Sequence, residues 1–515
     1  MPNCTATCAT VTPQPGDSFI FRGGDVWHTA NSSASPFIGT SNAVCNQWST
    51  LCGWWWHNGW SGSPTSCNWP STTSSCIYIG VDKTWYAGAS WTRPAIDLDN
   101  PLSKSLVASC PYDEQGTNSS PTYYPAAISF GTDHNNSFAN YIIFDGFEIY
   151  GGCSSSEDPR YINYNGTNDV FEELYLHGWT EASTGSDTNY LSVTTAQISN
   201  TYPNYNVWAY NVADGSDSYC ISVNKCEAHL GATFYDNEHN ICRWLAGCIG
   251  GGPNFMYFVH DNLFENMYEG WDPTVHDHVI HMFGNYTPAG TSIYFYNNTI
   301  RNTNDGITVS IDLADSGTIY FFNNVFHGVG NSGNCLAFRN SSAGSIDNAY
   351  FTNNTIDSPC RITAYALNGS GTQNWNVQNN HFIGFGVSSV SSIMKGSTGV
   401  TLNLTDNGNE VFQSEAVARR HGYTAADNYQ PVSARAGTYH AGANLSSKCA
   451  IYSPDSALCR GSTGGVRRAA VILLDPILQG ALPPLRGTAW DAGAYQFRSV
   501  LAKPVAPKHL KATVH

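Results

Sequence analysis

The residue types best suited to catalysis lie in the middle of the chain, at His276, Asp277, His278, His281 and Asp305. Two carboxyl groups on either side of a glycosidic bond can hydrolyse it, one as acid and the other as base or nucleophile. We therefore predict Asp277 and Asp305 as the catalytic pair. His278 and His281 are predicted to orient them or transfer protons.

Four further residues are predicted to support this pair. Asp217 and Glu269 are reserve catalytic carboxylates, and Trp271 and His276 are expected to contact the substrate. A lyase that uses a His or Tyr base is an alternative, as is a structural role in which Asp caps turns. His and Asp also ligate metals, but their spacing matches no known motif. No cofactor is required, and the metal stays unknown, although a bound ion such as Ca2+ is compatible.

These residues can meet only if successive repeats of the chain stack on one another. An Asn-Asn pair followed closely by an apolar residue recurs, and the second Asn residues are 26, 30 and 26 positions apart: Asn298, Asn324, Asn354 and Asn380. Asp261-Asn262, Tyr235-Asp236-Asn237 and Asp145-Gly146 extend the series upstream. A period of 25–30 residues indicates a solenoid.

The repeat contains short alternating β runs, such as 293–295 and 307–309, between clusters of Gly, Asn and Asp. No helix or Leu scaffold occurs in the repeat, which argues against ankyrin and leucine-rich units. A parallel β-helix fits, because each coil can pair with the next at about 4.8 Å. Its Asn residues at equivalent turns can then form a side-chain ladder. One helix is expected over 414–422, between a Ser cap and a Gly stop.

The sequence resembles the right-handed parallel β-helix proteins of the pectate-lyase-like superfamily, in their secreted bacterial form. The resemblance rests on the Asn-Asn units and on segments 16–24 and 490–495, and it covers about residues 10–500. It implies an all-β, right-handed parallel β-helix with a Trp/Cys-rich N-terminal region and a short C-terminal helix or cap. It leaves the activity open, because that superfamily holds lyases, hydrolases, epimerases and adhesins.

Four regions are expected along the chain. The N-terminal Trp/Cys-rich region and first coils take residues 1–130, and the central coils take 131–405. The C-terminal coils and cap take 406–500, and a tail takes 501–515.

The expected register follows from a column of inward apolar residues. The predicted column contains Ile221, Ile249, Ile280, Ile307 and Leu336. This register makes His278 and Asp305 neighbours on adjacent coils, and it brings Cys220 close enough to Cys248 for a disulfide.

The composition of the chain limits the classes of molecule that it is expected to bind. The chain has 515 residues and a net charge of −16, from 23 Lys and Arg against 39 Asp and Glu. Such a chain is a poor nucleic-acid binder, and it contains no apolar run long enough for a membrane span. Scarce basic residues disfavour a uronic-acid polymer unless Ca2+ bridges, so a neutral polysaccharide is the expected partner and hydrolysis the expected reaction. A lyase and a non-catalytic, adhesive or fibre-forming β-helix remain the alternatives, and the oligomeric state stays open.

The cysteine and tryptophan content adds two expectations. Sixteen cysteines, some in close pairs such as Cys449 and Cys459, favour disulfides and hence secretion. Trp54, Trp55 and Trp56 are expected to bind substrate, because sugar rings pack well on indole faces. The alternative is that they fill the interior of an N-terminal cap.

Replacing both Asp277 and Asp305 with Asn should abolish cleavage of a neutral polysaccharide, because an amide cannot transfer the required proton. Release of reducing ends from neutral and acidic polysaccharides measures hydrolysis, and absorbance of unsaturated products identifies a lyase. An unchanged rate in the double variant would contradict the assignment.

Overall fold

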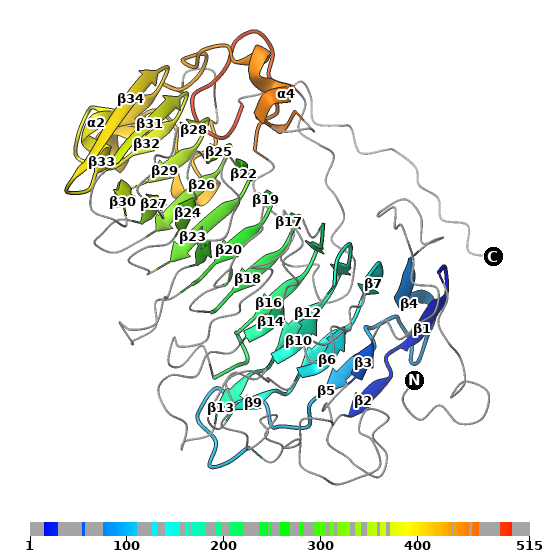
Figure 1. Ribbon diagram of the computed structural model, residues 1–515. Helices are drawn as coiled ribbons and strands as arrows, with labels where there is room; N and C mark the ends of the chain where they lie inside the picture. Colours follow the sequence, from blue (N-terminus) through cyan, green and yellow to red (C-terminus); the bar gives the residue numbers. More distant parts are fainter. Residues whose placement is uncertain are drawn as a thin grey trace, which may run out of the picture.

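Short parallel strands form most of the regular structure (Figure 1). The computed structural model describes residues 15–28, 54–56, 76–110, 126–130, 140–154, 160–164, 166–181, 192–196, 205–219, 236–245, 248, 258–267, 279–282, 292–303, 309–313, 317–329, 335–340, 348–357, 361–366, 371–431, 433, 436–452, 456–462 and 485–496.

Two twelve-stranded sheets run the length of the described chain. Sheet 1 consists, in spatial order, of β1 (Ser18–Gly23), β4 (Ile77–Tyr86), β7 (Ile142–Asp145), β11 (Val170–Glu172), β15 (Val207–Ala209), β17 (Asp236–Glu238), β19 (Phe258–His260), β22 (Ser292–Tyr296), β25 (Thr318–Phe322), β28 (Asn348–Thr352), β31 (Gly371–Gln378) and β34 (Val400–Asn407). Sheet 2 consists of β2 (Val26–His28), β5 (Ala95–Asp97), β8 (Glu148–Tyr150), β12 (Tyr175–His177), β16 (Val212–Asp214), β18 (Ile241–Arg243), β20 (Leu263–Glu265), β23 (Thr299–Thr303), β26 (Val325–Val329), β29 (Thr355–Asp357), β32 (His381–Ile383) and β35 (Glu410–Phe412).

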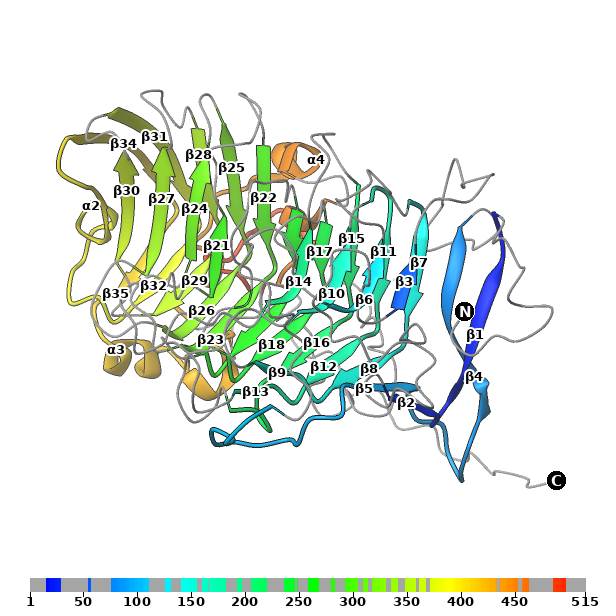
Figure 2. The same cartoon turned by 60° about the horizontal axis from the view of Figure 1, so that its bottom comes forward.

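Shorter sheets complete the coils on a third face (Figure 2). One contains β3 (Trp54–Trp56), β6 (Ala126–Phe130), β10 (Arg160–Tyr164) and β14 (Ser192–Ala196), and a small one contains β9 (Cys153–Ser154) and β13 (Thr180–Glu181). Another contains β21 (Ile280–Met282), β24 (Val309–Leu313), β27 (Leu336–Asn340), β30 (Ile362–Ala366) and β33 (Met394–Gly396). Neighbouring strands in all these sheets are parallel and come from successive coils, which confirms the predicted parallel β-helix.

The turn between sheet 1 and sheet 2 contains a continuous ladder of buried asparagines. Its members are Asn211, Asn240, Asn262, Asn298, Asn324, Asn354, Asn380 and Asn409. At Asn324, for example, the side-chain NH2 donates to Phe295 O and Asn354 Oδ1, both at 3.0 Å, while Oδ1 accepts from Asn298 N–H at 3.0 Å. The ladder therefore satisfies backbone groups that the turn would otherwise bury unpaired.

Matching side chains also stack between coils. The inward rings of Phe295, Phe321 and Phe351 lie parallel at 4.9 Å between neighbouring centroids. On the outer face of sheet 1, Tyr294 and Tyr320 stack in the same way, also at 4.9 Å. Identical registers in successive coils produce these columns, because each coil repeats at the strand spacing.

The structure corrects three details of the expected register. Ile280 pairs with Val309, not with Ile307, so the register that would make His278 and Asp305 neighbours is shifted by two residues. The ladder residue in the coil of β17 is Asn240, because Asn237 points inward and accepts a hydrogen bond from Asn240. Cys248 forms its disulfide with Cys242 across a six-residue separation, so pairing with Cys220 is wrong.

Short helices follow the last coil, as expected. Helix α2 (Val390–Ile393) lies within the last coils, and α3 (Glu415–Arg420) has the predicted Ser414 cap, whose hydroxyl accepts from Val417 N–H. The remaining helices are α4 (Cys449–Tyr452) and the 3-10 turns η2 (Ala425–Asp427), η3 (Ser446–Lys448) and η4 (Ala457–Cys459). No helix in the described part of the chain is long and apolar enough to cross a bilayer.

The C-terminal segment covers part of sheet 1. Tyr452 of α4 packs on the outward rings of Tyr320, Phe322 and Tyr350, and Trp490 is buried in the same cluster. The predicted Cys449–Cys459 disulfide joins α4 to η4. This segment therefore acts as the cap that the sequence predicted, although it lies on the side of the coils.

Asn324→Ala should lower the free energy of unfolding by about 2–4 kcal/mol, because it leaves the Asn298 N–H and the Phe295 carbonyl buried without partners. Urea unfolding followed by circular dichroism measures this change. Asn403→Ala is the control, since Asn403 is exposed on β34, and it should change stability by no more than about 0.5 kcal/mol. Equal losses in the two variants would contradict a stabilising role for the ladder.

Candidate functional site

In the described part of the chain, the turn that contains the ladder also contains a group of ionisable side chains. In each coil, one residue with a left-handed backbone separates the sheet-1 strand from the ladder position. In the later coils this residue is asparagine, with φ between 54° and 57°: Asn297, Asn323, Asn353 and Asn379. Asparagine adopts this conformation at low cost. Upstream, the same position is Glu173, Tyr210, His239 or Asp261, with φ of 53° to 59°.

Bulky or charged residues in this conformation are uncommon, and they cluster at functional sites. They lie beside the last residues of the sheet-1 strands, which point outward. We call the resulting group the acidic corner; it consists of Asp145, Glu172, Glu173, Asp236, Glu238, His239, His260 and Asp261.

His260 joins the carboxylates of two neighbouring coils. Its Nδ1 lies 2.8 Å from Asp261 Oδ2, and its Nε2 lies 3.1 Å from Asp236 Oδ1 and 3.7 Å from Glu238 Oε2. Its ring stacks on Tyr296 at 4.6 Å. Burial alone would lower its pKa, but Asp236 and Asp261 raise the pKa of His260 well above its usual value. These two carboxylates therefore favour the protonated, positively charged form of His260.

Glu238 also tends to keep its proton, but its protonated form is neutral. The pKa of Glu238 is raised to about 8 overall: burial is the largest cause, the positive charge of His260 acts against it, and Asp236, Asp261 and Glu172 add to the increase. Burial also lowers the pKa of the neighbouring His239 to about 4. A carboxyl group that keeps its proton near neutral pH can act as a general acid.

Glu172 and Glu238 lie in one outward column with a small residue between them. Glu172 pairs with Ala209, and Ala209 pairs with Glu238, so the two glutamates are two coils apart. Two strand spacings place their backbones about 10 Å apart. Ala209 lies between them in this column, and its methyl group is fully buried.

Asp145 extends the acidic corner by one coil. Tyr78 OH donates to Asp145 Oδ2 at 2.5 Å, and Lys83 Nζ lies 2.8 Å from Glu173 Oε2. Burial, then Glu172 and Glu173, raise the pKa of Asp145 to about 8. The corner thus contains two carboxyl groups with raised pKa values, one on each side of Glu172.

A second ionic group lies beside the corner on sheet 2 and includes the predicted residue Asp217. His177 Nδ1 lies 2.7 Å from Asp217 Oδ2, and His177 Nε2 lies 2.9 Å from Glu148 Oε1. The His177 ring stacks between Tyr150 and Tyr175, at 5.3 and 4.3 Å. Because the imidazole occupies the space between these carboxylates, Asp217 and Glu148 cannot hold a sugar between them.

One group of described residues has the donor set of a metal site. A nitrogen of His28 and an oxygen from each of Asp97 and Asp99 all lie within 4.8 Å of one another. His28 Nδ1 is hydrogen-bonded to Asp99 Oδ1 at 2.5 Å. One nitrogen and two carboxylate oxygens suit a divalent transition metal better than Ca2+, which prefers six to eight oxygen ligands.

Most of the predicted site residues lie outside the described residues: Asp277, Asp305, His278, His276, Glu269 and Trp271. His281 lies on β21 and pairs with Ser310 of β24, and Trp54, Trp55 and Trp56 form β3, which pairs with β6; the side chains of these residues are not described. Their roles therefore stay predictions.

Sequence reasoning missed the acidic corner. The available signal was the pair of residues before the ladder position. In the later coils this pair is an aromatic or polar residue followed by Asn, whereas in the upstream coils it is Glu172-Glu173, Glu238-His239 or His260-Asp261. Such replacements become visible only when the ladder asparagine of each coil is identified correctly.

Strand pairing and register make this chain a parallel β-helix protein, the class that the sequence resemblance predicted. No protein-family model and no curated protein matches it. Among solved structures it is similar to a GH136 lacto-N-biosidase from Eubacterium ramulus, with 10% identity and a TM-score of 0.34 over 79% of this chain and 63% of that chain. The chain therefore spans less than two thirds of that protein.

Two lyases show comparable similarity. Pectate lyase Pel9A has 12% identity and a TM-score of 0.33, covering 96% of this chain and 90% of that chain. The PL6 family alginate lyase AlyGC has 12% identity and a TM-score of 0.30, covering 77% and 48%. At this level of similarity the matches say nothing of what this chain binds or catalyses.

Stability should depend on pH through His177. Burial lowers its pKa, but Asp217 and Glu148 outweigh burial and raise it from 6.5 to about 9. Because the folded-state pKa is raised, the stabilisation is complete below pH 6.5 and is lost as pH rises through about 9. His177→Gln should remove about 1–3 kcal/mol of this pH-dependent stability.

Urea unfolding of wild type and His177→Gln between pH 6 and 9.5 measures the difference. Asp217→Asn, which removes one of the two carboxylate partners, should give an intermediate pH dependence. Parallel curves for wild type and His177→Gln would contradict the assignment.

Proposed function

We propose that this protein is a secreted, carbohydrate-active β-helix protein that hydrolyses a neutral polysaccharide with paired carboxyl groups. The observation that supports this most directly is the Glu172–Ala209–Glu238 column. Carboxyl groups that invert the anomeric centre lie about 6.5–9.5 Å apart, which leaves room for a water molecule beside the sugar. Side chains whose backbones are about 10 Å apart can reach that separation.

The raised pKa of Glu238 supports a role as the general acid, which leaves Glu172 as the general base. Glu238, protonated at neutral pH, donates its proton to the glycosidic oxygen as the bond from that oxygen to the anomeric carbon breaks. Glu172 accepts a proton from a water molecule, whose oxygen forms the new bond to the anomeric carbon. The His260 imidazolium, 3.7 Å from Glu238 Oε2, stabilises the carboxylate that remains after proton transfer.

Asp277 and Asp305 remain an alternative pair for the same reaction. The proposal of a neutral substrate follows from the net charge of −16 and from the acidic corner, because both repel a polyanion. Three disulfides in the described residues, Cys110–Cys153, Cys242–Cys248 and Cys449–Cys459, support an oxidising compartment and hence secretion.

A polysaccharide lyase is the second candidate. Lys83 and Arg93 lie beside Glu173, through Lys83 Nζ to Glu173 Oε2 at 2.8 Å and Arg93 Nε to Glu173 O at 3.1 Å. Two cations at the acidic corner could neutralise the carboxylate of one uronic acid unit. Lys83 is ion-paired and Arg93 is buried, so we rank this activity below hydrolysis.

Glu238→Gln and Glu172→Gln should each lower kcat by about 100-fold or more, because each removes one proton-transfer group. Reducing-end release from neutral and acidic polysaccharides measures the rate, and proton NMR of the first product should show the inverted anomer. Wild-type activity should fall as pH rises through about 8, where Glu238 loses its proton, and Glu238→Gln should lack this limb.

Glu415→Gln is the matched control, since Glu415 is exposed on α3 and should leave the rate unchanged. Full activity in both corner variants, together with loss of activity in Asp277→Asn plus Asp305→Asn, would move the reaction to the other pair. Unsaturated products would establish a lyase, and no turnover of any glycan would leave a non-catalytic β-helix.

A further inference from the structure

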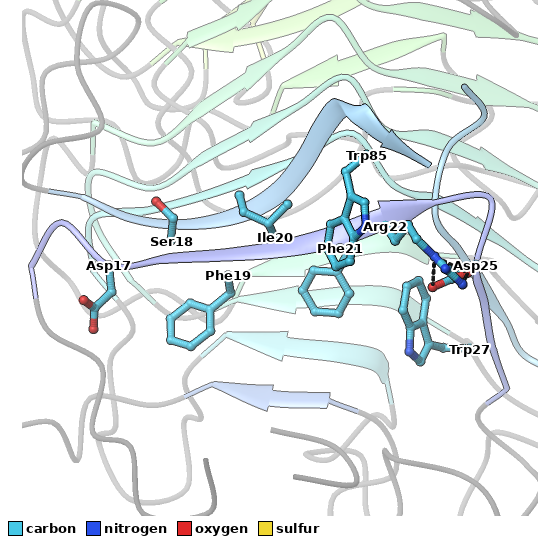
Figure 3. A pocket seen from close by; sticks show the side chains of 9 residues that line it. All are labelled: Asp17, Ser18, Phe19, Ile20, Phe21, Arg22, Asp25, Trp27 and Trp85. Carbon is cyan, nitrogen blue, oxygen red and sulfur yellow. Dashed lines mark hydrogen bonds and ion pairs between the residues drawn. The ribbon is translucent and has the colours of Figure 1, made fainter. Parts of the chain in front are cut away.

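A hollow of about 490 Å3 lies along β1, the first strand of sheet 1, far along the coils from the C-terminal cap (Figures 1 and 3). Its lining comes from β1 and the residue before it, from β2 and the residue before it, and from the outer half of β4: Asp17, Ser18, Phe19, Ile20, Phe21, Arg22, Asp25, Trp27 and Trp85. A volume of this size is in the range of small-molecule sites. The hollow shares no residue with the acidic corner.

Aromatic side chains form one part of the lining. Trp85 is 51% exposed at the rim, although indoles are usually well buried. Phe21 and Trp27 lie deeper and pack edge to face, with ring centroids 5.2 Å apart (Figure 3). The exposed Trp85 indole provides a flat apolar face of the kind on which a sugar ring can stack.

A fixed polar pair forms the other part. Arg22 Nη2 donates to Asp25 Oδ1 at 2.6 Å, and Arg22 Nε donates to both carboxylate oxygens at 3.0 Å. This pairing holds both side chains in place while each stays partly exposed, at 42% and 30%. A guanidinium has five N–H donors and a carboxylate has about four acceptor sites, so both partners retain hydrogen-bonding capacity for hydroxyl groups.

The charges of the lining favour a neutral ligand over an acidic one. Arg22 and Asp25 neutralise each other, and Asp17 is the remaining charged residue of the lining, so the hollow offers no net positive charge to an acidic sugar. Adjacent hydroxyls on a pyranose ring match a planar donor–acceptor pair, and the C–H face of the same ring matches the indole.

We propose that this hollow is a binding site for one or two rings of a neutral polysaccharide, separate from the catalytic pair. The proposal rests on the carbohydrate function proposed above, but it does not depend on Glu172 or Glu238. By binding chain segments away from the acidic corner, the hollow would keep an insoluble or polymeric substrate near the site of cleavage.

Titration calorimetry of the full chain tests this, in a Glu172→Gln plus Glu238→Gln background that prevents turnover. The probes are cellohexaose, xylohexaose and mannohexaose, with a galacturonic acid hexamer as the acidic comparison. We expect at least one neutral hexasaccharide to bind, the acidic hexamer to bind more weakly, and Trp85→Ala to weaken the neutral ligand about tenfold.

Tyr86→Ala is the matched control, because Tyr86 is the next residue of β4, is also exposed, and does not line the hollow. It should leave the dissociation constant unchanged. Trp85→Tyr, which keeps an aromatic face, should retain most of the affinity, and circular dichroism checks that each variant is folded.

Three results would overturn the proposal: no binding of any neutral hexasaccharide, equal affinity in Trp85→Ala and its parent, or a preference for the galacturonic acid hexamer. Because binding and cleavage are measured separately, a protein that binds through Trp85 but hydrolyses nothing would refute only the proposed reaction.

Discussion

The need to satisfy buried backbone groups at one turn sets the register of this protein. A parallel β-helix changes strand direction at every turn, and each change exposes N–H and C=O groups that a sheet cannot pair. The Asn211–Asn409 ladder meets this need eight times, and each amide from Asn240 to Asn380 bonds to the coil on either side. An error of one position would break two sets of bonds, so the ladder fixes the alignment of neighbouring coils and of the columns that project from them.

The same turn leaves one adjacent position free to vary in chemistry. In the later coils that position is asparagine, and two of those side chains bind the C-terminal segment through Asn323 to Ala457 O and Asn379 to Ala443 O. In the earlier coils it is Glu173, Tyr210, His239 or Asp261. The left-handed position thus has two roles along the stack. In the later coils it attaches the C-terminal segment, and in the earlier coils it contributes to a cluster of ionisable groups.

The sequence allowed the architecture to be predicted because the repeated Asn-Asn pairs reflect a physical requirement of every coil. Asn298, Asn324, Asn354 and Asn380 occupy the expected ladder positions, and the helix after Ser414 begins where its cap indicates. The exact register was harder to predict, because Ile307 and Val309 are both apolar and lie two positions apart. In a β-strand both side chains therefore point to the same face, and either could have been the partner of Ile280.

The candidate site was harder to predict than the register. Which residues of different coils become neighbours depends on loop lengths, and composition does not reveal these. Glu172 and Glu238 are 66 positions apart in sequence, yet they are two coils apart in space. The raised pKa of Glu238 depends on burial and on the charges of neighbouring coils, and neither is visible in a linear pattern.

Stacked coils also make the distance between functional groups change in steps. Side chains in one outward column can be separated by one strand spacing or by two, with no intermediate value. Asp145 and Glu172 are one coil apart, and Glu172 and Glu238 are two coils apart. These separations resemble the two that distinguish retaining from inverting cleavage of a glycosidic bond. In such a scaffold the stereochemical course of a reaction could change through a single substitution in a column, with no movement of the backbone.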